Sequence, residues 1–69
     1  MELNIKALRR LMAAQGYNVA SLARAAGVSA QAVNVWLKHG VTPRIDTLGK
    51  LARALGVDIY DLTIEEELQ

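Results

Sequence analysis

The chain has 69 residues, no cysteine and a formal net charge of +1, and 52% of its residues are hydrophobic. This length predicts one small domain, and the lack of cysteine excludes disulfide cross-links and thiolate zinc sites, as suits a reducing cytosol. No apolar run approaches the roughly 20 residues of a membrane-spanning helix, and the spaced apolar residues of "MELNIKALRR" are not expected to act as a signal peptide.

Five segments are predicted to be helices, because apolar residues recur at helical spacing and no segment alternates as a strand would. In chain order the predicted helices cover residues 5–15, 19–26, 30–38, 45–55 and 59–66. Side chains that can accept bonds from free amides precede four of them, and glycines that can end a helix in a left-handed conformation follow four. The predicted N-caps are Asn4, Asn18, Ser29 and Asp58, and the predicted terminal glycines are Gly16, Gly27, Gly40 and Gly56.

A pair of apolar residues brackets each predicted N-cap. The first residue of the pair comes just before the cap, and the second comes five positions after the first. This is the spacing of a hydrophobic staple. The pairs are Leu3 and Leu8, Tyr17 and Leu22, Val28 and Val33, and Val57 and Leu62. In the first helix Ile5, Leu8 and Met12 then form one apolar stripe, which is most simply part of the core.

The second and third helices are joined by the short turn "GVS" at residues 27–29. Ala23 is small enough for the third helix to cross closely, and Gly27 can take the positive φ that reverses the chain. Trp36 is predicted to lie in the core, on the same side of its helix as Val33. A tight turn between two helices is the arrangement of a DNA-binding helix-turn-helix.

Residues 19–38, "VASLARAAGVSAQAVNVWLK", resemble the helix-turn-helix of the phage repressor and Cro-type (XRE) regulators. The match has alanine at its fifth position, glycine at the ninth, a β-branched residue at the fifteenth and a large apolar residue at the eighteenth. The segment "TPRIDTLGKLARALGVDIYDL" is similar to the family's fourth and fifth helices, so the resemblance covers about residues 3–63. It implies an all-α, compact five-helix, lambda-repressor-like domain over residues 1–69. It also implies a cytoplasmic, prokaryotic or phage-encoded regulator that binds palindromic double-stranded DNA as a homodimer.

The third helix can read DNA although it is poor in charge. If Val33 faces the core, then Gln31, Asn34, Val35 and Lys38 lie on the opposite face. Glutamine and asparagine can each pair with adenine through two hydrogen bonds, and valine can pack against a thymine methyl group. The predicted base contacts are Ser29, Ala30, Gln31, Asn34 and Val35.

Phosphate binding is expected from the flanks of this helix. Asn18 and the free amides at the start of the second helix form one candidate anion site. Similar family members touch the DNA backbone around the end of the third helix, which adds Lys38, His39, Gly40, Thr42 and Arg44. Arg9, Arg10 and Arg24 are weaker candidates, because the sequence does not fix their faces.

The fourth helix has a regular apolar stripe of Leu48, Leu51, Ala52 and Leu55 but two unusual positions. Arg44 stands where the family usually has a small polar cap. Gly49 lies inside the helix, where glycine costs about 0.5–1 kcal/mol relative to alanine. We expect another backbone to approach closely at Gly49, with a merely tolerated glycine as the alternative.

Charge is segregated along the chain. Residues 1–57 hold all eight basic residues and two acids, a net charge of +6, whereas residues 58–69 hold the other five acids, a net charge of −5. A polyanion is therefore expected to meet the basic body. The acidic tail, about residues 64–69, is expected to be solvated, and Ile59, Leu62, Ile64 and Leu68 form a candidate dimer face.

The leading hypothesis is a sequence-specific repressor or Cro-like regulator with its reading helix in the major groove. The alternative is a protein-interaction module, such as an antitoxin-type or regulatory subunit, that uses Val35 or the fifth helix. An enzyme is disfavoured, because there is one histidine, no glycine-rich phosphate loop and no pair of carboxylates outside residues 58–69. No cofactor, metal, small-molecule ligand or membrane is implied.

Overall fold

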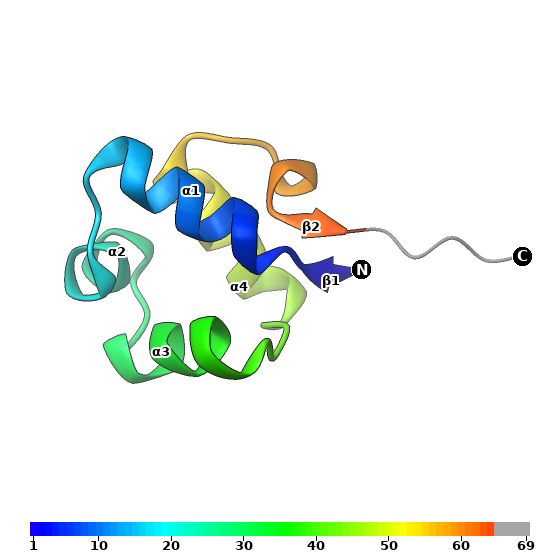
Figure 1. The fold of residues 1–69 in the computed structure, drawn as a ribbon, viewed down its shortest axis with the longest axis horizontal. Coiled ribbons are helices and arrows are strands. Elements are labelled where there is room, and N and C mark those ends of the chain that lie inside the picture. Colours follow the sequence, from blue (N-terminus) through cyan, green and yellow to red (C-terminus); the bar gives the residue numbers. More distant parts are fainter. Residues whose placement is uncertain (65–69) are drawn as a thin grey trace, which may run out of the picture.

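Four α-helices make up most of residues 1–64, the part of the chain that this computed structural model describes (Figure 1). They are α1 (Ile5–Gln15), α2 (Val19–Ala26), α3 (Ala30–His39) and α4 (Ile45–Leu55). A 3-10 turn, η1 (Ile59–Asp61), follows α4, and the strand β1 (Glu2–Leu3) pairs antiparallel with β2 (Thr63–Ile64). The four predicted helices between residues 5 and 55 are confirmed, with α3 one residue longer than expected.

The predicted N-caps are confirmed by the hydrogen bonds that they accept. The side-chain oxygens of Asn4, Asn18 and Ser29 each accept from the backbone N–H three residues further on, at 2.8–3.1 Å. At α4 the side chain of Arg44 makes no capping bond, and the carboxylate of Asp46 instead accepts from the N–H of Thr47 at 2.9 Å. The acid in the first turn of α4 therefore supplies the negative charge that this helix start favours.

One apolar core joins the four helices to both ends of the described chain. Leu8, Leu22, Val33, Leu48, Leu51 and Leu62 are its fully buried members. All eight staple residues lie in this core or pack against it, and Trp36 is buried as predicted. No helix within residues 1–64 is long and apolar enough to cross a membrane.

The prediction of a fifth helix over residues 59–66 is not confirmed. The carboxylate of Asp58 accepts from the N–H of Tyr60, and that of Asp61 accepts from the N–H of Asp58, so the chain closes a single tight turn. The Leu62 carbonyl then accepts from the N–H of Asn4 at 2.7 Å, and β2 begins. Pairing with the first residues of the chain replaces the expected helix, and it makes the prediction of no strand wrong. Residues 65–69, with Leu68 and most of the predicted acidic tail, lie outside the described residues.

Two further expectations need correction. Nothing lies within 4 Å of the position that a Cβ atom on Gly49 would take, so close packing is not the reason for this glycine. Leu62 is fully buried, which removes it from the candidate dimer face. Of the other members of that face, Ile59 is half-buried against the core, and the exposed fraction of Ile64 is 47%.

Candidate nucleic-acid interface

The turn between α2 and α3 places the two helices at a steep angle. Figure 1 shows α2 nearly end-on and α3 lengthwise. Gly27 has φ +73°, and the next N–H group, that of Val28, donates to the carbonyl of Ala23 at 2.9 Å. A left-handed residue at this point turns the chain within three residues, and the buried Ala23 methyl group leaves room for α3. The geometry is the predicted helix-turn-helix.

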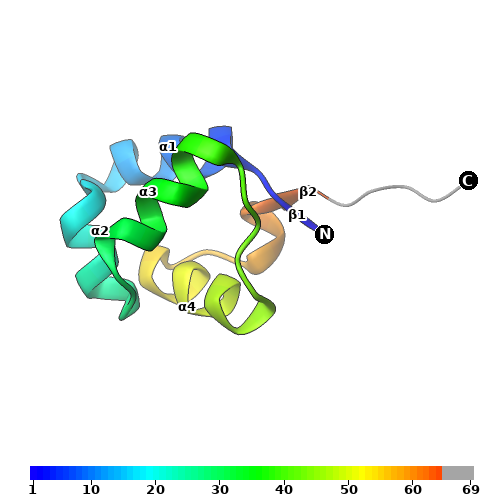
Figure 2. The same cartoon turned by 90° about the horizontal axis from the view of Figure 1, so that it is seen from below.

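α3 lies along one side of the molecule, at the bottom in Figure 1 and toward the viewer in Figure 2. Val33 and Trp36 anchor it in the core. The four residues predicted for the outer face are all exposed, namely Gln31, Asn34, Val35 and Lys38. Three of these side chains are uncharged, so the face offers amide groups and a methyl surface to a partner.

The start of α3 adds two short exposed side chains, Ser29 and Ala30. The Oγ atom of Ser29 accepts from the N–H of Ala32 at 3.0 Å. Acting as an acceptor leaves the hydroxyl hydrogen free to donate. The cap of α3 can therefore also contact a partner that lies against the helix start.

A groove of about 320 Å³ lies beside the start of α2. It is lined by Arg9, Met12, Ala13, Tyr17, Asn18, Val19 and Leu37. The Asn18 oxygen caps Ser21, which leaves its side-chain NH₂ group to donate, and the first N–H groups of a helix have no acceptor within the helix. These donors and the positive end of the α2 dipole make one wall of the groove suited to an anion.

Arg9 borders the same groove from α1. Its Nη2 atom donates to the carbonyl of Leu37 near the end of α3, at 3.2 Å. This bond holds a guanidinium group close to both the start of α2 and the end of α3. The sequence placed Arg9 only among the weaker candidates, because its orientation depends on a carbonyl of a different helix.

The residues predicted to contact phosphate at and after the end of α3 fall into two groups. Lys38, His39 and Arg44 are exposed, and the side chain of Arg44 is 87% accessible. In contrast, the Gly40 N–H donates to the Trp36 carbonyl at 3.0 Å, and the half-buried Thr42 accepts at Oγ1 from the N–H of Leu3 at 3.1 Å. The first group can reach a phosphate, whereas the second holds the loop in place.

Little of the positive charge on this surface is neutralised by neighbouring acids. Within residues 1–64 the single ion pair joins Arg44 Nε to Asp46 Oδ1, at 3.6 Å, and both side chains are exposed. An exposed pair of this kind contributes little. The cations around α3 are thus available to an anionic partner.

The family model described as the Cro/C1-type HTH DNA-binding domain matches residues 7–66. The match covers all four helices except the first two residues of α1, and it confirms the resemblance seen in the sequence. No curated protein and no solved structure matches the chain.

Proposed function

The chain belongs to the Cro/C1-type helix-turn-helix DNA-binding domains, and we propose that it is a sequence-specific transcriptional repressor that reads its operator with α3 in the major groove. The observation that carries the proposal is the outer face of α3, where exposed amide side chains stand on a helix anchored in the core. The major groove is about 12 Å wide and admits one α-helix, whose diameter is about 10–12 Å.

Base recognition is assigned to the uncharged side chains of α3. Gln31 and Asn34 each pair with an adenine through its N6 and N7 atoms, and Val35 packs against a thymine methyl group. Ser29 donates its hydroxyl hydrogen to a base edge, and Ala30 adds a methyl contact. Specificity therefore comes from shape and paired hydrogen bonds rather than from charge.

Phosphate contacts are assigned to both ends of the helix pair. At the start of α2 the Asn18 side chain and the free N–H groups bind one phosphate, with Arg9 beside them. At and after the end of α3, Lys38, His39 and Arg44 bind the next part of the DNA backbone. Thr42 can still donate its hydroxyl hydrogen to a phosphate oxygen. Gly40 has no side chain, so the DNA backbone can pass close to the loop.

A homodimer on a palindromic operator completes the proposal, with half-sites one helical turn, about 34 Å, apart. Because Leu62 is fully buried, the proposed dimer contacts among the described residues are Ile59 and Ile64. The whole chain acts as one non-enzymatic DNA-binding domain.

The test is selection of bound sequences from a random duplex DNA pool, followed by a salt titration of the enriched site. Arg9, Lys38 and Arg44 supply three charged contacts in each copy, so a dimer is expected to give a slope of log affinity against log salt of about −5. A palindrome rich in adenine and thymine, with such a slope, would support the regulator.

The alternative function would give a different result in the same experiment. A protein-interaction module would enrich no sequence and would bind DNA weakly, at low salt only. Val35, whose exposed fraction is 37%, would then be the apolar contact for a partner protein instead of for a thymine.

A further inference from the structure

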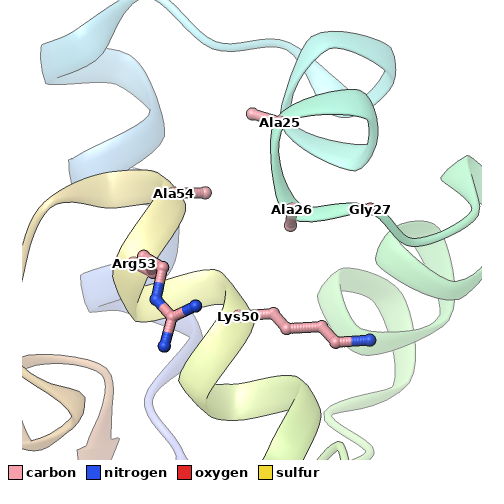
Figure 3. A pocket seen from close by; sticks show the side chains of 6 residues that line it. All are labelled: Ala25, Ala26, Gly27, Lys50, Arg53 and Ala54. Atoms are coloured by element: carbon pink, nitrogen blue, oxygen red, sulfur yellow. The ribbon is translucent and has the colours of Figure 1, made fainter.

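A second groove, of about 360 Å³, lies between the end of α2 and the C-terminal half of α4 (Figure 3). Its lining comes from Ala25, Ala26 and Gly27 on one side and Lys50, Arg53 and Ala54 on the other. Nothing in the proposed reading of DNA uses these residues. The proposed phosphate site is at the start of α2, about 12 Å away along an eight-residue helix.

The groove exists because the facing residues are small. α2 presents two methyl groups and a glycine at its end, and Ala54 adds only a methyl group from α4. The position of a Cβ atom on Gly27 has no neighbour within 4 Å, so the groove is open there as well. Its floor can therefore accept a small apolar side chain.

Two cations stand on the α4 wall of this groove. Lys50 and Arg53 are three residues apart, which places their Cβ atoms about 5–6 Å from each other on one helix face. Both are exposed, and among the described residues neither has an acidic group within ion-pair distance. Figure 3 shows Lys50 extending away from α4 below Gly27, while the Arg53 side chain lies along α4.

We propose that this groove binds an acidic segment of a partner protein. Two carboxylates one turn apart pair with Lys50 and Arg53, and a small apolar side chain between them lies on Ala25 and Ala54. A chain segment fits better than a small molecule, because ligand pockets enclose most of a small ligand, whereas this groove is more open than enclosed. The proposal does not depend on the proposed DNA contacts.

The test is an NMR titration of the isotope-labelled chain with a short capped helical peptide that carries glutamates three positions apart and alanine and leucine beside them. The backbone signals of the groove residues are expected to shift and saturate. A twin peptide with glutamine for glutamate is expected to leave them unchanged. The double variant Lys50→Glu/Arg53→Glu is expected to bind the acidic peptide about five- to tenfold more weakly, as the loss of two exposed ion pairs implies.

Two further variants distinguish peptide binding in the groove from attraction to net charge and from effects of misfolding. Lys6→Glu/Arg10→Glu changes the net charge by the same amount as Lys50→Glu/Arg53→Glu, but on the exposed side of α1. Its affinity for the peptide is expected to stay within about twofold of that of the parent chain. Ala25→Leu fills the groove without changing charge, and it is expected to weaken binding while the other signals stay in place. Equal losses in both charge variants, or unchanged binding in Ala25→Leu, would overturn the proposal.

Other occupants would also be recognised in the same spectra. Groove signals that move when the protein alone is concentrated would assign the groove to a second copy of the chain. Groove signals that move with duplex DNA, together with lost DNA affinity in Lys50→Glu/Arg53→Glu, would assign it to the DNA surface. Either result would overturn the partner-protein proposal, and neither depends on which bases α3 reads.

Discussion

Gly49 and Gly27 allow two effects of glycine on stability to be measured separately: its cost inside a helix and its benefit at a left-handed position. An added Cβ atom has open space at both positions, so a substitution to alanine creates no clash at either. Gly49 lies inside α4 with ordinary helical φ, whereas Gly27 ends α2 with φ +73°. Any difference between the two alanine variants therefore reports backbone conformation and not packing.

Gly49→Ala is expected to raise the free energy of unfolding by about 0.5–1 kcal/mol, because alanine loses less conformational entropy in a helix. In a domain of this size 1 kcal/mol corresponds to about 4–8 °C in Tm, so the expected rise is about 2–8 °C. Gly27→Ala is expected to lower the free energy of unfolding by about 1–2 kcal/mol, because its side chain must adopt a left-handed backbone.

Thermal and urea unfolding, followed by far-UV circular dichroism, measure both variants against the parent chain. The opposite signs are the result that matters. A Gly49→Ala variant that melts lower than the parent would show that a neighbour does approach this position. A Gly27→Ala variant of unchanged stability would refute the assignment of the turn.

Three further outcomes follow from the site and the core. Gln31→Ala is expected to cost about 1–3 kcal/mol at one base pair and to relax the preference there, and an unchanged preference in a repeated selection would contradict its role. Lys38→Ala is expected to weaken all DNA sequences alike and to reduce the salt slope by about 0.9 for each copy; an unaltered slope would exclude its phosphate contact. Leu62→Ala is expected to destabilise the fold by about 2–5 kcal/mol in urea unfolding without a change in oligomeric state by sedimentation. Wild-type stability together with a lost dimer would return Leu62 to the dimer face.

The parts of the fold that the sequence predicted are those with local causes. An N-cap such as Asn18 bonds an amide three residues away, and a terminal glycine such as Gly27 bonds carbonyls of the preceding turn. These interactions depend on neighbours in the sequence, so the bounds of α1 to α4 could be predicted closely. The exposure of Gln31 and Asn34 followed in the same way from helical periodicity, although their contact with bases stays a prediction.

The errors arose where distant segments meet. The predicted fifth helix is missing because the Leu62 carbonyl bonds the N–H of Asn4, at the other end of the described chain. The orientation of Arg9 was open because it depends on the Leu37 carbonyl of another helix. Close packing at Gly49 was expected from the cost of a helical glycine, but the sequence does not show whether another backbone lies opposite.

These distant contacts bear on DNA binding although none of them involves a predicted base contact. The N–H of Leu3 bonds Thr42, and a Cβ atom on Gly40 would lie 3.2 Å from Ile5, so the first residues of the chain hold the loop after α3. Leu62 in turn holds Asn4. Ordering a loop costs roughly 1–2 kcal/mol per residue, and here the core supplies that order before any DNA is bound. In the proposed complex α3, which has few charges, relies on the cations at its two flanks for affinity, while its amide side chains supply specificity.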